Sequence, residues 1–296
     1  MKMQIDPNRT YFLDGATGTE IQRRGYHQKL PLWSAEVLFD QPDMITAIHR
    51  DYIRAGADII TTNTFRTQRR TLATSGLDAD TERINRLAVD CAAKAREEVQ
   101  SERPVYIAAS ITTLADCYHP ELVPEASVCE AEHQEQIELL ASTPIDLFIL
   151  ETFNTIGEAE IAARIAAHTG KPFMVSFTAD AEGNILSGER WEDAIARIRH
   201  YEPLAFMVNC VPSDVATRAL DQMIPYACAA DIPYGAYANG AGVPEDDSGW
   251  DFKTDGSPAD TYAQACQTWK NMRATIIGGC CGTTPEYTKR YSALAD

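Results

Sequence analysis

Short apolar runs of the kind that form buried strands alternate with longer, helix-like segments, and this alternation is the strongest constraint on the fold. Eight such runs occur within 296 residues. Several consist almost entirely of valine, isoleucine, leucine and phenylalanine, which is typical of parallel strands buried on both faces. We expect the strands at residues 11–14, 58–64, 105–110, 146–151, 172–177, 205–210, 233–238 and 274–278.

Segments with apolar residues at helical spacing separate these runs. The first long segment begins at Ser34, which can cap a helix, and ends at Gly56, which suits a left-handed helix end. The third connection has the weakest pattern, with a helix expected around 130–141. The other expected helices span residues 85–99, 156–168, 191–200, 214–230, 258–272 and 285–293.

Eight successive strand–helix units predict an α/β fold of the (β/α)8 TIM barrel type, as one domain over residues 1–296. An open, doubly wound sheet would show the same alternation and remains the alternative. No Gly-x-Gly-x-x-Gly follows the first run, which disfavours the dinucleotide-binding version of that alternative.

Two long irregular stretches, residues 112–127 and 239–257, both follow expected strands. The active-site loops of barrels lie at the carboxyl ends of the strands. These stretches are therefore candidate lids over an active site.

Three cysteines stand at the carboxyl ends of two expected strands. Cys210 ends the sixth strand, and Cys280 and Cys281 follow the eighth within the glycine-rich segment 278–282. In a barrel these ends converge on one mouth. The glycines allow the bend that two neighbouring cysteines need if both are to reach one ion. Three thiolates suit zinc and leave one of its positions open, which is the arrangement of a catalytic site.

Two other interpretations of these cysteines stay open. Free cysteine is among the most buried residue types, so the three could simply be core residues. Alternatively, Cys117 or His119 could supply a fourth ligand and make the site structural or sensory. The remaining cysteines are expected in helices or loops, at Cys91, Cys129, Cys228 and Cys266.

Charge and cysteine use narrow the range of partners. The formal charge is 26 − 43 = −17, which disfavours nucleic acid and anionic membrane surfaces. The first residues lack the apolar core of a signal peptide, and no apolar stretch approaches the ~20 residues needed to cross a bilayer. We therefore expect a cytoplasmic protein that acts on small molecules. In that reducing compartment, eight cysteines indicate metal binding or catalysis rather than disulfides.

Several segments, in order along the chain, carry the motifs of one enzyme family. They are Asp14-Gly15-Ala16-Thr17-Gly18-Thr19-Glu20, Leu32-Trp33-Ser34-Ala35, residues 52–65, Glu151-Thr152-Phe153, Asn209-Cys210 and residues 278–285. Through them the chain resembles the homocysteine S-methyltransferase family over nearly its whole length. That family includes betaine–homocysteine methyltransferase, S-methylmethionine-dependent enzymes and the homocysteine-binding module of cobalamin-dependent methionine synthase.

The resemblance implies a (β/α)8 barrel with a zinc ion held by Cys210, Cys280 and Cys281. It implies that Asp14 and Glu151 receive the amino group of homocysteine, which agrees with the position of both acids at strand ends. Backbone groups near other strand ends would meet the carboxylate of homocysteine, at Gly15, Thr62, Asn63 and Phe65. An ordinary hydrogen-bonding role in the loop stays open for Asn63.

The predicted donor end of the site departs from the family pattern. Residues 110–120 lack the Gly-Pro stretch often found in S-methylmethionine-dependent members, and Arg66 stands where betaine enzymes have a tyrosine. We predict zinc-dependent transfer of a methyl group from a sulfonium donor, S-methylmethionine or S-adenosylmethionine, to homocysteine, giving methionine. The alternatives are a different thiol or selenol acceptor, a betaine-like donor, or a corrinoid protein partner. The sequence gives no indication of the oligomeric state.

Overall fold

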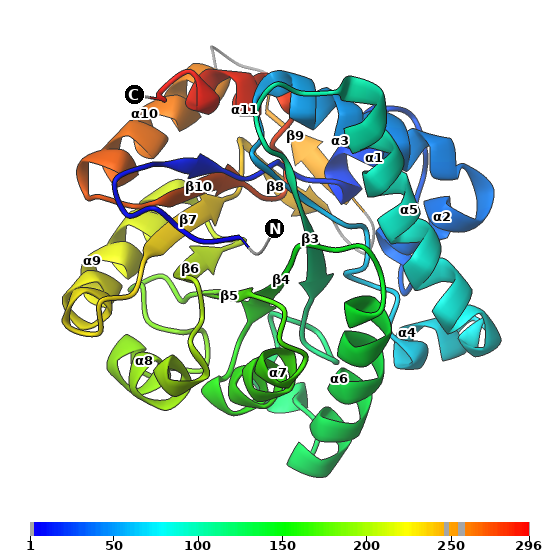
Figure 1. Ribbon diagram of the computed structural model, residues 1–296, viewed down its shortest axis with the longest axis horizontal. Coiled ribbons are helices and arrows are strands. Elements are labelled where there is room, and N and C mark those ends of the chain that lie inside the picture. Colours follow the sequence, from blue (N-terminus) through cyan, green and yellow to red (C-terminus); the bar gives the residue numbers. More distant parts are fainter. Residues whose placement is uncertain (1–2, 246–248, 254–257, 296) are drawn as a thin grey trace.

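Eight parallel strands surround the centre of the molecule, and helices cover them on the outside (Figure 1). The computed structural model describes residues 3–245, 249–253 and 258–295. The barrel strands are β1 (Tyr11–Phe12), β2 (Ile59–Thr61), β3 (Tyr106–Ile111), β4 (Leu147–Phe153), β5 (Phe173–Phe177), β6 (Phe206–Asn209), β7 (Tyr234–Ala238) and β10 (Ile276–Gly279). Every expected strand is present, with bounds shifted by a few residues.

The two ends of this sheet meet. The strand order is β1-β10-β7-β6-β5-β4-β3-β2, and every neighbouring pair is parallel. A parallel bridge joins Leu13 to Ile59, and the Asp14 N–H donates a 2.9 Å hydrogen bond to the Ile59 carbonyl. The prediction of a (β/α)8 barrel is therefore confirmed. The doubly wound alternative is wrong, because its sheet would have two separate edges.

Alternation along the strands decides which side chains fill the barrel. On β4, Leu147 and Ile149 belong to the inner core with Met174 of β5, whereas Phe148 packs toward the helices. The inner series of β4 continues at its carboxyl end with Glu151. The same alternation that builds the apolar interior therefore places an acid in the barrel mouth.

The outer helices agree with the predicted pattern in most places. They are α3 (Pro42–Ala55), α5 (Thr81–Val99), α6 (Ala126–Ala141), α7 (Ile156–His168), α8 (Trp191–Ile198), α9 (Ser213–Ala229), α10 (Pro258–Asn271) and α11 (Pro285–Ser292). Two short helices that were not predicted, α1 (Gly18–Arg23) and α4 (Arg69–Ala73), lie in loops at the carboxyl ends of strands. No helix in the described part of the chain has the length and apolar character needed to span a membrane.

The expectation of one continuous helix from Ser34 to Gly56 is wrong. The segment forms a 3-10 turn, η1 (Trp33–Ala35), followed by α2 (Glu36–Asp40) and α3. Because proline has no backbone N–H, Pro42 cannot continue α2 and instead occupies the first turn of α3. Gly56 ends α3 with a φ of 111°, as expected.

The stretch 239–257 contains an antiparallel hairpin that was not predicted, made of β8 (Gly242–Glu245) and β9 (Gly249–Phe252). Parts of this candidate lid, at 246–248 and 254–257, lie outside the described residues. The Trp250 N–H donates to Gln22 Oε1 at 2.8 Å, and Gln22 Nε2 donates to the Trp250 carbonyl at 3.1 Å. These bonds fasten the hairpin to α1 and keep Trp250 at the barrel mouth.

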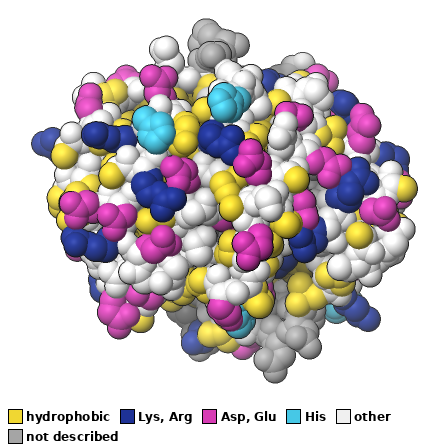
Figure 2. Space-filling model, turned by 90° about the horizontal axis from the view of Figure 1, so that it is seen from below, with side chains coloured by type: hydrophobic (Ala, Val, Ile, Leu, Met, Phe, Trp, Pro, Cys, Tyr) yellow, Lys and Arg dark blue, Asp and Glu magenta, His cyan; other side chains and the backbone are white. Residues whose placement is uncertain are grey.

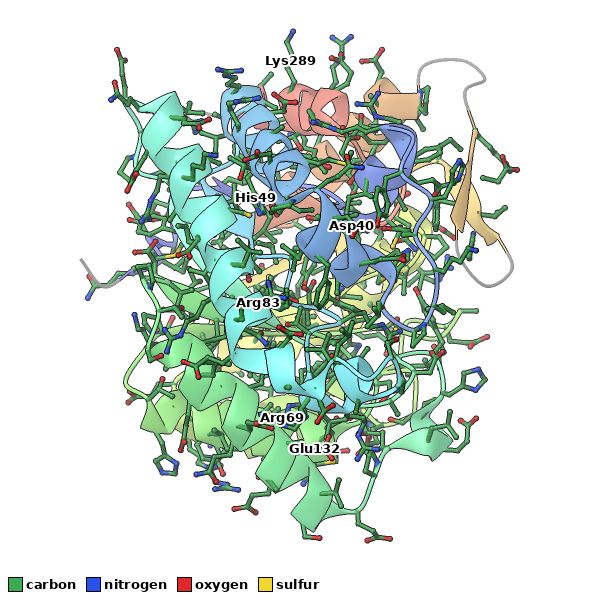
Figure 3. All side chains as sticks on the ribbon, turned by 90° about the vertical axis from the view of Figure 1, so that its right-hand side faces the viewer. Asp40, His49, Arg69, Arg83, Glu132 and Lys289 are labelled. Atoms are coloured by element: carbon green, nitrogen blue, oxygen red, sulfur yellow. The ribbon has the colours of Figure 1, made fainter. Side chains whose placement is uncertain are left out.

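Ion pairs join neighbouring helices on the outside of the barrel. Arg69 pairs with Glu135 and Arg70 with Glu132, both at 2.6 Å, which connects α4 to α6 (Figure 3). Acidic and basic side chains are interspersed over the face seen in Figure 2. Exposed pairs of this kind contribute only about 0–1 kcal/mol each. Their importance here is that they hold the segment after β2 in place.

Candidate active site

The three cysteines singled out in the sequence lie together at the carboxyl ends of β6 and β10. Their Sγ atoms are within 4.8 Å of one another, and those of Cys210 and Cys281 are 3.8 Å apart. Two thiolates bound ~2.3 Å from a tetrahedral zinc ion would be about 3.8 Å apart. The cluster formed with Cys280 therefore has the spacing and the donor atoms that zinc requires, with a fourth position left for a ligand.

Unusual backbone conformations produce this convergence. Cys210 follows β6 with a left-handed φ of 59°, which is uncommon for a residue other than glycine. After β10, the Cys280 N–H still donates to the Ala238 carbonyl at 2.8 Å, and Gly282 then turns the chain with a φ of 75°. A Cβ at Gly282 would collide with the Trp250 indole, so glycine is needed for the turn and for the close contact.

The three thiols are too close to ionise together. Hydrogen bonds from Cys280 and Cys281 lower the pKa of Cys210 well below its ordinary value. The pKa values of Cys280 and Cys281 are raised well above it, chiefly by their hydrogen bonds to Cys210. Three thiolates at this spacing therefore need a bound cation. Soft sulfur ligands favour zinc over magnesium or calcium.

All nine residues predicted for the site line one cavity of ≈ 330 Å³ at the barrel mouth. The cysteines form one part of its wall. The others are Asp14, Gly15, Thr62, Asn63, Phe65 and Glu151. They come from the carboxyl ends of β1, β2 and β4, which is where the barrel fold gathers residues distant in sequence.

Two buried acids in the cavity wall have no cationic partner among the described residues. Glu151 accepts hydrogen bonds from the Ser110 hydroxyl and, at 3.4 Å, from the Tyr237 hydroxyl. Asp14 accepts from the Thr61 N–H at 2.8 Å and from its hydroxyl at 3.0 Å. Burial raises the pKa of Glu151 to about 7 and that of Asp14 to about 8. Among the described residues neither acid has a compensating positive charge, which the ammonium group of a ligand would supply.

Residues 11–294 match the sequence model of the family described as Homocysteine S-methyltransferase. The chain belongs to the homocysteine S-methyltransferase family. It is 29% identical to the homocysteine S-methyltransferase of Escherichia coli (strain K12), with 96% of this chain and 95% of that protein covered. It is 26% identical to the selenocysteine Se-methyltransferase of Brassica oleracea var. italica, with 92% of this chain and 85% of that protein covered.

Solved structures with the same fold support the family assignment. Crystal structures of the homocysteine methyltransferase MmuM from Escherichia coli, in an oxidized and a metallated form, match with TM-scores of 0.84 and 0.83. They are 28% and 27% identical and cover 96% and 97% of this chain and 96% of MmuM. The resemblance predicted from the sequence is thereby confirmed. A metallated relative also supports the interpretation of the cysteine cluster as a metal site.

The segment after β2 lines the cavity through Thr62, Asn63 and Phe65. The Thr62 hydroxyl shares a 2.9 Å hydrogen bond with the Thr64 hydroxyl, and Asn63 Nδ2 donates to the Ser34 carbonyl at 2.8 Å. These side chains therefore serve the local structure of the loop. The N–H groups of Asn63 and Phe65 have no acceptor in the described part of the chain, so an anionic group in the cavity can accept from them.

Gly15 allows the loop after β1 to pack tightly beside Asp14. A Cβ at Gly15 would lie 2.6 Å from the Thr283 hydroxyl and 2.8 Å from the Tyr52 hydroxyl. Thr283 also accepts a 3.2 Å hydrogen bond from the Ala16 N–H. The glycine is therefore required by close packing at the cavity wall.

The loop after β3 reaches the cysteine cluster. The Tyr118 hydroxyl lies 3.0 Å from Cys210 Sγ and donates to the Cys210 carbonyl at 3.2 Å. His119, considered as a fourth ligand, is exposed and pairs with Glu121 at 2.8 Å. Cys117 lines the cavity but is not one of the residues whose ligand atoms cluster. The described residues therefore do not form a closed, four-ligand site.

The sequence analysis assigned no individual role to four residues of the site, namely Thr61, Ser110, Tyr118 and Tyr237. A signal existed for three of them, because Thr61, Ser110 and Tyr237 share the inward side of their strands with Ile59, Ala108 and other inner-core residues. Tyr118 had no such signal, because its position depends on the path of a loop.

Proposed function

We propose that the chain transfers a methyl group from a sulfonium donor, S-methylmethionine or S-adenosylmethionine, to the thiol of homocysteine, giving methionine in a zinc-dependent reaction. One observation carries the proposal: a single cavity holds a cluster of three cysteines and two buried acids that lack a cationic partner among the described residues. Homocysteine has a thiol at one end and an ammonium group at the other, so one molecule satisfies both parts of the cavity.

Cys210, Cys280 and Cys281 would hold the zinc ion. When bound, zinc would stabilise the thiolate form of the acceptor near neutral pH. The left-handed turn at Cys210 and the hydrogen bond from the Cys280 N–H to β7 fix the directions from which the sulfur ligands approach. Tyr118, hydrogen-bonded to Cys210, restrains that side chain further.

Asp14 and Glu151 would bind the ammonium group of homocysteine. Thr61 and Ser110 hold the two carboxyl groups in place, so little reorganisation is needed when the ligand binds. A nearby ammonium group favours the ionised form of both acids and reverses the effect of burial on their pKa values. The N–H groups of Asn63 and Phe65, which have no acceptor among the described residues, would donate to the carboxylate of the same molecule.

The transfer step then depends on alignment of the donor with the acceptor sulfur. A carbon–sulfur bond forms to the acceptor as the bond between the methyl carbon and the donor's sulfonium sulfur breaks. The electron pair of the broken bond stays on the donor sulfur, which leaves as a neutral thioether. Tyr118 and Trp250 in the cavity wall limit the access of water and the orientations available to the donor.

A selenol acceptor is the second candidate, because the chain is similar to a protein named selenocysteine Se-methyltransferase. A selenol and a thiol acceptor would both bind at the same cysteine cluster. The geometry of the cluster therefore does not distinguish them, and a competition experiment is needed. Equal concentrations of homocysteine and selenocysteine with one sulfonium donor would show which acceptor is methylated. Betaine and a methylated corrinoid protein complete the donor panel.

Metal analysis combined with a methionine assay tests the main proposal. Cys281→Ala should lose bound zinc and transfer activity. Cys228→Ala, which changes an exposed cysteine of α9, is the matched control and should retain both. Full activity of Cys281→Ala without metal would refute the zinc dependence. Failure of the wild type to form methionine from homocysteine with every sulfonium would refute the function itself.

A further inference from the structure

Arg66 brings a permanent positive charge to the cavity wall. It follows Phe65 in the segment after β2 and lines the cavity together with Asp116 and Tyr118 of the loop after β3. The guanidinium carbon lies 5.6 Å from the Phe65 ring centroid, and the Nε atom is buried. Because arginine stays protonated in proteins, this part of the wall is cationic.

The Arg66 guanidinium has no hydrogen-bond or ion-pair partner within the described ranges. Its Nε atom is a buried polar atom without a hydrogen bond. Asp116, an acid in the same wall, instead accepts a 2.8 Å hydrogen bond from the Tyr118 N–H. A partly buried charged group without a partner is unfavourable, so its position indicates a ligand that supplies one.

The segment that carries Arg66 is held by hydrogen bonds on both sides. Gln136 Nε2 donates to the Thr64 carbonyl at 3.2 Å, and the Thr67 hydroxyl donates to Asn85 Oδ1 at 2.7 Å. The ion pairs between α4 and α6 hold the next turn of chain. Arg66 is therefore presented from a fixed support, which lowers the entropy lost when it binds a ligand.

The charge of Arg66 restricts the kind of donor that the cavity accepts. A sulfonium is a cation, and a guanidinium beside it would repel it. A donor that also carries a carboxylate avoids this repulsion by pairing that group with the guanidinium. The two buried acids and the free N–H groups after β2 already match the two charged ends of homocysteine, which leaves Arg66 for the second substrate.

We propose that Arg66 binds the carboxylate of the methyl donor and so restricts donors to sulfonium compounds that carry a carboxylate. The inference rests on the proposed function and adds a specificity-determining residue to it. The planar guanidinium offers a carboxylate two parallel hydrogen bonds. Arg66 thereby fixes the end of the donor distant from the methyl group that is transferred.

Steady-state kinetics with a matched pair of donors tests the assignment. One donor is S-methylmethionine, and the other is its carboxamide, in which a neutral group of similar shape replaces the carboxylate. We expect the wild type to prefer the acid by about 10- to 100-fold in kcat/KM, the range for loss of a hydrogen bond to a charged group. Arg66→Gln should bring the ratio of the two kcat/KM values close to one, mainly by raising the KM of S-methylmethionine. Arg66→Lys should restore part of the preference for S-methylmethionine.

The readouts separate failure of the assignment from failure of the function. The KM of homocysteine should be unchanged in Arg66→Gln, which also shows that the variant is folded. An unchanged preference for the acid in an active Arg66→Gln enzyme, or a rise in the KM of homocysteine instead, would overturn the role of Arg66. Lack of turnover by the wild type with both donors and with S-adenosylmethionine would overturn the proposed function and the assignment with it.

Discussion

Buried His49 is expected to make the folded protein sensitive to acid. It lies on the buried side of α3 (Figure 3), and neither ring nitrogen has a hydrogen-bond partner within the described residues. Burial lowers the pKa of His49 from 6.5 to about 4, because the imidazolium would lose its hydration without gaining a partner. The folded state therefore favours the neutral ring.

The sign and size of the effect follow from the two pKa values. Above pH 6.5 the ring is neutral in the folded and unfolded states, and it does not change the free energy of unfolding. Below that pH the unfolded chain binds a proton that the folded chain does not, so stability falls as the pH falls toward about 4. At ~1.36 kcal/mol per pKa unit, the loss is about 2 kcal/mol at pH 5 and roughly 3 kcal/mol in full.

Urea unfolding at pH 7.5 and pH 5 measures this contribution. His49→Leu removes the titrating ring, so the variant should lose about 2 kcal/mol less than the wild type between the two pH values. His27→Leu changes an exposed histidine and is the matched control, with the pH dependence of the wild type. If the wild type and His49→Leu lose the same free energy, burial of His49 does not depress its pKa as argued.

Three further predictions concern the site. Glu151→Gln keeps the side-chain shape but removes the charge, so steady-state kinetics should show a rise of about 10- to 100-fold in the KM of homocysteine. An unchanged KM would count against binding of the ammonium group by Glu151. Gly282→Ala introduces a Cβ at positive φ against Trp250, so urea unfolding should show a loss of about 1–3 kcal/mol in stability. Gly157→Ala is the control, because the space around its Cβ is open, and it should not destabilise the fold. Removal of the metal with a chelator should abolish transfer and leave the far-ultraviolet circular dichroism intact, because the barrel core does not depend on the ion. Readdition of zinc should restore activity, and unfolding of the metal-free protein would contradict this prediction.

The accuracy of the sequence-based predictions depended on how local each signal is. The barrel strands were found because each is a short apolar run, and a strand buried on both faces needs little else. The helix predicted across Pro42 was wrong because apolar residues at helical spacing lie on both sides of Pro42, whereas the missing N–H of proline ends one helix and begins the next there. The hairpin β8–β9 was missed because each of its strands is only four residues long and begins with a glycine. Its position depends on the contact between Trp250 and Gln22, which are far apart in sequence.

The amino-acid order alone determined which residues could meet at the barrel mouth. Strand ends of a parallel barrel lie on one rim, so a cysteine after β6 and two after β10 are brought to the same mouth, where the turns at Cys210 and Gly282 then set their spacing. In the same way, the alternation of side chains along β4 places Glu151 on the side that faces the barrel interior. These conclusions need only the periodicity of the chain and the handedness of its connections.

Only the tertiary structure decided how those residues are charged and partnered. The raised pKa values of Asp14 and Glu151 come from burial, which depends on every element that covers the mouth. The contact of Tyr118 with Cys210 depends on a loop path that no local pattern encodes. The same holds for Arg66, whose guanidinium has no hydrogen-bond or ion-pair partner among the described residues. Solvent exclusion and contacts across the chain are properties of the assembled fold, because each arises from atoms that many separate segments contribute.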